Sequence, residues 1–150
     1  LKLSPPLRTE NDREALVEAV NDGTIDVIVS DHNPQDEESK RLTFAQAATG
    51  ASGVETLLPL ALELFHNKKI KIKNLLASIT SNPSKILGIN KGNLDKGNDA
   101  DLCVVDINKP WIVNKELLKS KSKNTPIENR KLQGKVLKTF VKGELLYESN

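Results

Sequence analysis

An apolar run that leads into two ionisable residues constrains the fold of this chain most. Residues 25–29 (IDVIV) are rich in β-branched side chains and lead into Asp31 and His32, and Pro34 then stops regular structure. This composition predicts a strand that is buried on both faces, as in a parallel sheet. In α/β barrels and open α/β sheets, reactive groups follow the carboxyl ends of such strands. We therefore expect Asp31 at an active-site edge.

The residues before this run predict a helix that follows an earlier strand. Lys2 and Leu3 are typical of a strand end, which the following two prolines close. Thr9 and Asp12 have the spacing of a capping box, and Gly23 stands where a helix usually ends. The order strand, helix, strand indicates a βαβ unit, and hence an α/β barrel or a doubly wound sheet.

The rest of the chain changes from helical to β-type patterns. We predict a polar loop over 36–43, a largely buried helix over 54–65 with Pro59 near its first turns, and short helical stretches over 74–79 and 84–87. Short strands are predicted over 102–105, 111–113, 136–141 and 145–147, with Lys142-Gly143 as a hairpin turn. A domain boundary near Ile89 would give units 1–89 and 90–150.

Composition excludes several classes of protein. With 37% hydrophobic and 28% charged residues, no stretch reaches the roughly 20 apolar residues of a membrane helix. The single Cys103 lies in an apolar run, so we expect a small core residue and a reducing, cytoplasmic location. Because the chain begins with Leu and contains no Met, we expect it to be a segment of a longer protein.

The net charge of +2 is unevenly distributed. Residues 1–66 carry 5 basic and 12 acidic side chains, whereas residues 115–150 carry 9 basic and 4 acidic ones. The basic lysines are spread over loop and strands with little aromatic interleaving, which favours a solvated face over a nucleic-acid surface.

Several motifs together resemble the carboxyl-terminal part of dihydroorotases, within the cyclic amidohydrolases. In order they are KLSPPLR, DGTIDVIVSDHNP, GASGVETLLPL, SNPSKILGI, GNLDKGNDADLCVVD and KTFVKGELLY. The resemblance implies a metal-dependent TIM barrel with a small β-domain. Residues 1–4 would end the seventh barrel strand, 24–31 would form the eighth, and 93–150 would belong to the β-domain.

The resemblance also implies a reaction. Dihydroorotases interconvert dihydroorotate and carbamoyl aspartate in pyrimidine biosynthesis, using one or two zinc ions, and we expect a cytoplasmic homo-oligomer acting on this small-molecule substrate. The family's aspartate falls on Asp31, which would contact the metal and move the proton from nucleophilic water to the leaving amide nitrogen. From the residues alone, the plainer interpretation is that Asp31 caps the backbone amides of Asn33 or Gln35.

The two histidines do not extend this site. The family's main histidine ligands would lie upstream of residue 1, so His32 is expected to orient the loop, and His66 to be exposed. No pair of histidines here has ligand spacing. We therefore expect the segment alone to lack a complete zinc site and to be inactive.

Two departures from the family pattern concern the substrate. Ser4 stands where members commonly carry Asn, and Gln35 where they carry a second His, and both positions usually hold the substrate. Hydrogen bonding could survive in altered form. The family also uses backbone groups that fall on Thr49 and Gly50, although Gly50 could equally belong to a plain loop before a helix.

Three functional interpretations remain open. The first is a zinc-dependent dihydroorotase, and the second is a sister enzyme of the hydantoinase or allantoinase kind, which Ser4 and Gln35 could accommodate. The third is a non-catalytic dihydroorotase-like partner of aspartate transcarbamoylase. Retention of Asp31 argues against the third, because a scaffold does not require an exposed carboxylate.

Overall fold

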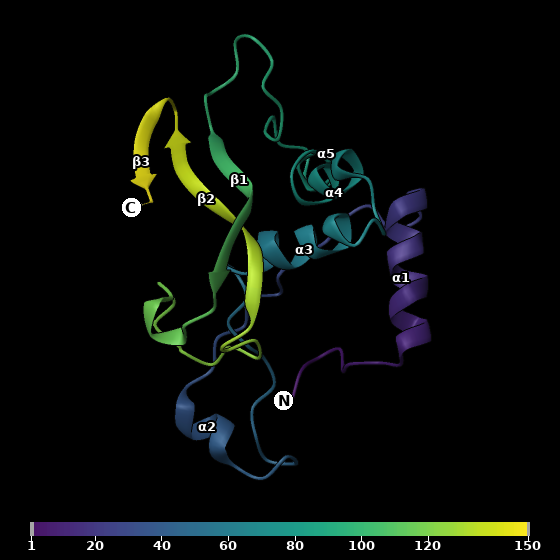
Figure 1. The fold of residues 1–150 in the computed structure, drawn as a ribbon, viewed down its shortest axis with the longest axis vertical. Helices are drawn as coiled ribbons and strands as arrows, with labels where there is room; N and C mark the ends of the chain where they lie inside the picture. Colours follow the sequence, from purple (N-terminus) through teal and green to yellow (C-terminus); the bar gives the residue numbers. More distant parts are fainter. Residues whose placement is uncertain (1, 150) are drawn as a thin grey trace.

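The computed structural model describes residues 2–149, in which a twisted antiparallel sheet lies on one side and most of the helices on the other (Figure 1). α3 packs between them, and α2 lies apart at one end of the molecule. The helices are α1 (Glu10–Asp22), α2 (Glu37–Arg41), α3 (Leu57–His66), α4 (Ile72–Ile79) and α5 (Ser81–Ile86), with a 3₁₀ turn at Lys115–Leu117; the strands are β1 (Leu102–Ile112), β2 (Lys131–Val141) and β3 (Glu144–Glu148).

The predicted signals at the ends of α1 are confirmed. The Thr9 side chain accepts from the Asp12 N–H, and the Asp12 carboxylate accepts from the Thr9 N–H in return. Gly23 ends the helix in the left-handed conformation, with φ of 88°. The apolar face of α1 is only partly covered, because Val20 packs against the core whereas Leu16 is 55% exposed.

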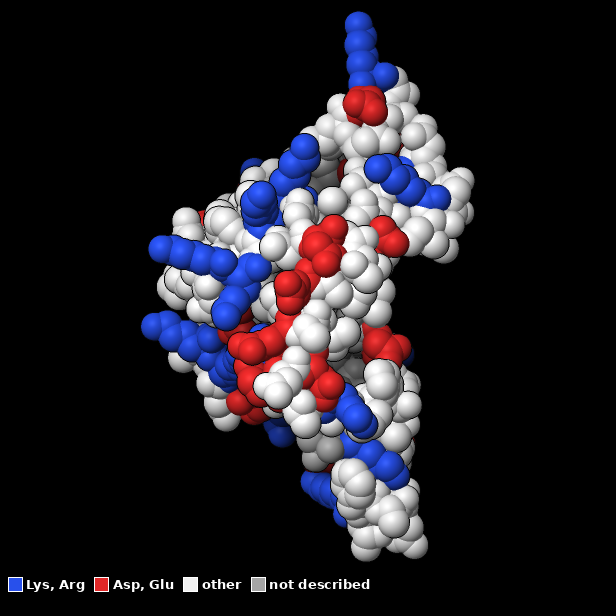
Figure 2. Space-filling view, turned by 90° about the vertical axis from the view of Figure 1, so that its right-hand side faces the viewer, with Lys and Arg blue, Asp and Glu red and all other residues white. Residues whose placement is uncertain are grey.

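Acidic side chains gather in the middle of the face of the molecule shown in Figure 2.

The prediction of a buried strand at 25–29 is wrong, because these residues form no regular secondary structure. No described segment forms a ladder with it, and Val29 is 68% exposed. Its backbone is held by helices instead: the Ile28 N–H donates to the Ser78 carbonyl at 3.1 Å, and the Asn82 side chain donates to the Asp26 carbonyl at 2.9 Å. A strand exists only through its ladder, so β-branched composition alone does not create one. Lys2 and Leu3 are likewise unpaired in any described sheet.

The core lies where α3 and α4 meet. Its buried residues are Ala61, Leu62, Ile70 and Leu75, each at most 4% exposed. Pro59 is the third residue of α3, as predicted, where its missing N–H costs no helical hydrogen bond. The helical stretch predicted over 84–87 begins earlier than expected. α5 includes Asn82 and Pro83, because a proline in a first helical turn is tolerated, and the chain bends at Thr80.

The predicted polar loop over 36–43 contains the short helix α2. The Asp36 carboxylate caps it by accepting from the Ser39 N–H at 2.7 Å. Glu37 and Arg41, one turn apart, form an ion pair at 2.6 Å. Local capping therefore gives regular structure to a segment that has no apolar periodicity.

The sheet has the order β1-β2-β3, and the predicted hairpin is confirmed at Lys142 and Gly143, with φ of 51° and 84°. The two short strands predicted at 102–105 and 111–113 form one strand, whose register shifts where the Asp106 carboxylate accepts from two following backbone amides. Cys103 is exposed, so its predicted core position is wrong. The following Val104 is exposed as well, and the Cys103 thiol lies 3.6 Å from the Thr139 hydroxyl of β2.

Gly134 of β2 brings the sheet against α3. It has φ of 106°, and a Cβ at this position would collide with the Cδ1 atom of Leu62. The Trp111 indole N–H donates to the Gly134 carbonyl at 3.0 Å. The close contact between α3 and β2 therefore requires glycine here.

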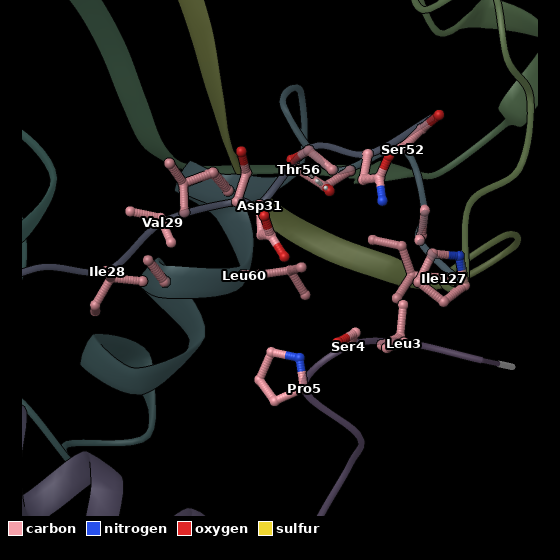
Figure 3. Close-up of a pocket in the computed structure, with 18 of the residues that line it drawn as sticks. Leu3, Ser4, Pro5, Ile28, Val29, Asp31, Ser52, Thr56, Leu60 and Ile127 are labelled. Carbon is pink, nitrogen blue, oxygen red and sulfur yellow. Dashed lines mark hydrogen bonds between the residues drawn. The ribbon is translucent and has the colours of Figure 1, made fainter. Parts of the chain in front are cut away.

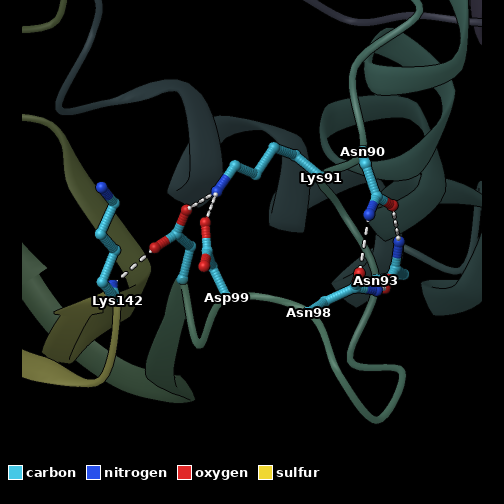
Figure 4. A network of polar contacts seen from close by, with 7 residues as sticks. Asn90, Lys91, Asn93, Asn98, Asp99 and Lys142 are labelled. Atoms are coloured by element: carbon cyan, nitrogen blue, oxygen red, sulfur yellow. Dashed lines mark hydrogen bonds and ion pairs between the residues drawn. The ribbon is translucent and has the colours of Figure 1, made fainter.

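The loop between α5 and β1 is tied to the hairpin by charges (Figure 4). The Lys91 ammonium contacts Asp99 at 2.9 Å and Asp101 at 2.5 Å, and Asp101 also accepts from the Lys142 N–H. These contacts hold the pKa of Asp101 below its ordinary value, and the largest contribution comes from Lys91. In return, the pKa of Lys91 is raised, first by Asp101 and then by Asp99.

Within residues 2–149 no helix has the length and apolar content needed to cross a membrane.

Candidate functional site

A cavity of about 420 Å³ lies beside the carboxyl end of the 25–31 segment (Figure 3). Its walls are formed by residues 3–5, residues 28–31, Asn33, residues 50–53 and one side of α3 from Leu57 to Leu64, and Ile127 closes one side. The structure thus brings together three of the predicted site residues, Ser4, Asp31 and Gly50. They come from segments that are far apart in the sequence.

The Asp31 carboxylate is directed toward the space between Leu60 and Ser4 (Figure 3). It accepts no hydrogen bond from any residue in the described range 2–149. The Asn33 N–H donates to the Ala51 carbonyl at 3.0 Å, so the alternative that Asp31 caps this amide is wrong. Asp31 also has φ of 43°, a conformation that costs a non-glycine residue about 1 to 3 kcal/mol. The backbone therefore presents a free carboxylate to the cavity.

His32 holds the loop that carries Asp31. Its Nδ1 accepts from the N–H groups of Gly53 at 3.1 Å and Val54 at 3.3 Å. Accepting at Nδ1 places the proton of the neutral ring on Nε2. The imidazole thus ties the 31–35 loop to the start of the α3 region, in keeping with the predicted orienting role. His66 is half-buried rather than exposed, because its Nε2 contacts the Ile107 carbonyl at 3.0 Å between α3 and β1.

Gln35 reaches the cavity only through Asn33. The Gln35 side chain donates to the Asn33 side-chain oxygen at 2.8 Å, and the Asn33 amide donates to the Thr49 carbonyl at 3.3 Å. Asn33 lines the cavity, whereas Gln35 lines a neighbouring one of about 1010 Å³ and Thr49 lines neither. Asn33 was not among the predicted site residues, although its position between Asp31 and Gln35 was an available signal.

Both backbone polar groups of Gly50, its N–H and its carbonyl, form hydrogen bonds with other segments. Its N–H donates to the Lys2 carbonyl at 3.1 Å, and its carbonyl accepts from Lys40 at 3.0 Å and Asn124 at 3.1 Å. Its φ is 122°, and a Cβ there would lie 2.5 Å from the Asn33 carbonyl oxygen. Only glycine fits this close approach of two loops.

Lys40 is a second residue of the site that was not predicted from the sequence. Its ammonium donates to the carbonyls of Lys2 at 3.3 Å, Ala48 at 2.7 Å and Gly50 at 3.0 Å. It therefore joins α2 to two walls of the cavity. Charge-assisted hydrogen bonds of this kind are among the stronger polar contacts in proteins.

The described residues do not fit a complete metal site. Within residues 2–149, no three His, Cys, Asp or Glu side chains come together as metal ligands would. Among the described residues that line the cavity, Asp31 alone is ionisable. This chain therefore offers a metal one carboxylate.

Comparison with known sequences shows one family over nearly the whole chain. Residues 4–146 match the amidohydrolase family. The chain is 46% identical over 146 residues to a dihydroorotase of Ehrlichia canis, covering 97% of this chain and 33% of that protein. It is 45% identical over 146 residues to a dihydroorotase of Acetivibrio thermocellus, covering 97% and 34%. The chain thus spans about a third of the length of these relatives.

Solved structures agree on the fold. An L-hydantoinase (dihydropyrimidinase) from Arthrobacter aurescens superposes with a TM-score of 0.91 at 31% identity, covering 98% of this chain and 34% of that one. A dihydropyrimidinase from Brevibacillus agri gives a TM-score of 0.92 at 23% identity, covering 98% and 33%, and supports the fold alone. The predicted fold class, part of a TIM barrel with a small β-rich unit, is confirmed. Together the sequence match and the fold show that this chain belongs to the amidohydrolase family.

Proposed function

We propose that the intact protein containing this chain is a zinc-dependent dihydroorotase, which interconverts dihydroorotate and carbamoyl aspartate in pyrimidine biosynthesis. The similarity to dihydroorotases over 97% of the chain supports this choice of substrate. The observation that carries the proposal is the free Asp31 carboxylate in the cavity. Because the chain covers a third of its relatives, the activity belongs to the whole protein.

Asp31 has the properties that opening a cyclic amide requires. Water that attacks the amide carbonyl must lose a proton, and the ring nitrogen must gain one when the C–N bond breaks. A carboxylate without a hydrogen-bond donor in residues 2–149 is free to accept that proton and return it. Zinc, when bound, would lower the pKa of a water molecule and polarise the carbonyl. One or two ions would take Asp31 as one ligand and their remaining ligands from other parts of the intact protein.

The predicted substrate-binding residues would act in two ways. The Ser4 hydroxyl lines the cavity and has no partner among residues 2–149, so it is free to hydrogen-bond the substrate. Asn33 contacts Gln35, Thr49 and Gly50, and together these residues would hold the cavity wall against the substrate ring. Gln35 supplies no charge, so the substrate carboxylate would require a cationic partner from the rest of the protein.

A hydantoinase-type activity is the second candidate. The 31% identity to an L-hydantoinase and the departures at Ser4 and Gln35 favour it. A non-catalytic partner of aspartate transcarbamoylase is disfavoured by the free Asp31 carboxylate.

We further propose that residues 1–89 and 90–150 form two structural units, and that the intact protein is a homo-oligomer with a cytoplasmic location.

The test is turnover by the intact protein on dihydroorotate, a hydantoin and allantoin, before and after chelation and zinc restoration. We expect turnover of dihydroorotate that chelation removes and zinc restores. Restoring the family pattern with Gln35→His and Ser4→Asn should keep or improve that activity, with a gain in transition-state binding of at most roughly 1 to 3 kcal/mol. Turnover of the hydantoin alone would select the sister enzyme, and no turnover together with binding to aspartate transcarbamoylase would select the scaffold.

A further inference from the structure

A loop between β1 and β2 reaches across to the candidate site. In this connecting loop, residues 118–125, the Asn124 carbonyl accepts from the Ser52 N–H at 2.8 Å, and the Ser122 carbonyl accepts from the Ser52 hydroxyl at 3.0 Å. The Ser122 hydroxyl donates to the Gln35 carbonyl at 2.5 Å. The connecting loop therefore contacts both loops that line the cavity.

The connecting loop is itself held in place. The Glu55 carboxylate accepts from the N–H groups of Lys119 at 2.7 Å and Ser120 at 3.1 Å. The Lys123 ammonium folds back onto the Leu118 carbonyl at 2.6 Å, and Leu118 is buried. Because both the backbone and the ends of the connecting loop are fixed by these contacts, the loop can hold the residues that it contacts in place.

One side chain of this loop contacts the cavity wall. The Asn124 carboxamide donates to the Gly50 carbonyl at 3.1 Å, on the peptide that packs against Asn33. Asn124 lines the neighbouring larger cavity and not the one that contains Asp31. It thus fixes the wall that would face the substrate and has no access to the proton-transfer group.

We propose that Asn124 is a positioning residue, which sets substrate affinity by holding Gly50 in place through its side-chain amide. This inference rests on the proposed function. Loss of the amide should loosen the wall that binds the substrate and leave Asp31 undisturbed, so KM should change and kcat should not. The fold should survive, because Lys40 still donates to the Gly50 carbonyl and the Ser52 bond uses the Asn124 backbone.

The experiment compares Asn124→Ala, Asn124→Gln and Lys121→Ala in the intact protein, with dihydroorotate as substrate and thermal unfolding measured alongside. Lys121 lies on the same loop, is exposed and makes no polar contact within residues 2–149. We expect Asn124→Ala to raise KM about 5- to 10-fold with kcat within about twofold, the usual effect of one hydrogen bond. Asn124→Gln, which keeps the amide, should recover part of the loss, and Lys121→Ala should match the wild type.

Two results would overturn the inference while the proposed function stands. One is an unchanged KM in Asn124→Ala. The other is a raised KM accompanied by lower kcat and a lower melting temperature that Asn124→Gln does not relieve, which is the behaviour of a purely structural residue. Absence of wild-type turnover on dihydroorotate would overturn the proposed function and this inference together.

Discussion

The sheet and the segment that carries Asp31 satisfy their backbones in opposite ways. β1, β2 and β3 pair with one another, and two of them are joined by a two-residue hairpin. Residues 25–35 pair with no described strand and depend on hydrogen bonds from helices and loops far away in the sequence. The sheet is therefore organised by its own pairing, whereas the site is organised by its surroundings. Substitutions in the two regions should accordingly differ in kind.

The largest effect on stability is expected at Gly134, where the sheet meets α3. Gly134→Ala would add both a strained φ and a collision with Leu62, for a cost of about 2 to 5 kcal/mol. Gly143→Ala is the matched control, because Gly143 has φ of 84° and nothing within 4 Å of the added Cβ, and should cost about 1 to 2 kcal/mol. Urea unfolding of the intact protein measures both. Equal costs would show that α3 does not depend on this close contact.

A smaller effect is expected at the start of α1. Thr9→Ala removes the N-cap and should destabilise the helix by about 0.5 to 2 kcal/mol, measured by hydrogen exchange of the α1 amides. Asn11→Ala, within the same first turn, is the control. A similar loss of protection in the control would mean that the capping box contributes nothing specific.

The same cap predicts a pH dependence. Hydrogen bonds from Thr9, its side chain foremost, hold the pKa of Asp12 below its ordinary 3.8. The ionised cap therefore stabilises α1 above about pH 4, and this contribution fades as the pH falls through the lowered pKa. The difference between wild type and Thr9→Ala should shrink over that window. A difference that stays constant down to pH 2 would contradict the role of Asp12.

The smallest effect is expected at Lys91. Its partners Asp99 and Asp101 are exposed enough for solvent to screen them, so Lys91→Gln should lower the melting temperature slightly, and less in 1 M salt than at low salt. Lys96→Gln, in the same loop, is the control. A loss that salt does not reduce would indicate packing by the lysine stem rather than charge.

Local signals allowed some of these elements to be predicted. The bounds of α1 follow from Thr9 and Gly23, and the hairpin follows from Lys142-Gly143, because each signal acts within a few residues. The prediction of a strand at 25–29 was wrong, since no partner strand for it lies in the described residues. The position of Asp31 after that run was informative even so, because Pro34 forces a loop there whether or not a ladder forms.

The surroundings of the site could not be predicted in the same way. The contact from Lys40 to Lys2 spans 38 residues, and the contact from Asn124 to Gly50 spans 74. Neither leaves a periodic pattern, since single polar side chains that bind distant carbonyls resemble ordinary surface residues. Asn33 is the exception, because it lies inside a loop already singled out.

The central claim is that Asp31 moves the proton in the reaction of the intact protein, and its most direct test is turnover after Asp31→Asn. Asp26→Asn is the matched control, since Asp26 lies on the same segment and its exposed carboxylate has no partner within residues 2–149. We predict that Asp31→Asn lowers kcat on dihydroorotate by about 10² to 10⁴, with a small change in KM and partial retention of metal, while Asp26→Asn matches the wild type. Wild-type turnover in Asp31→Asn would contradict the account.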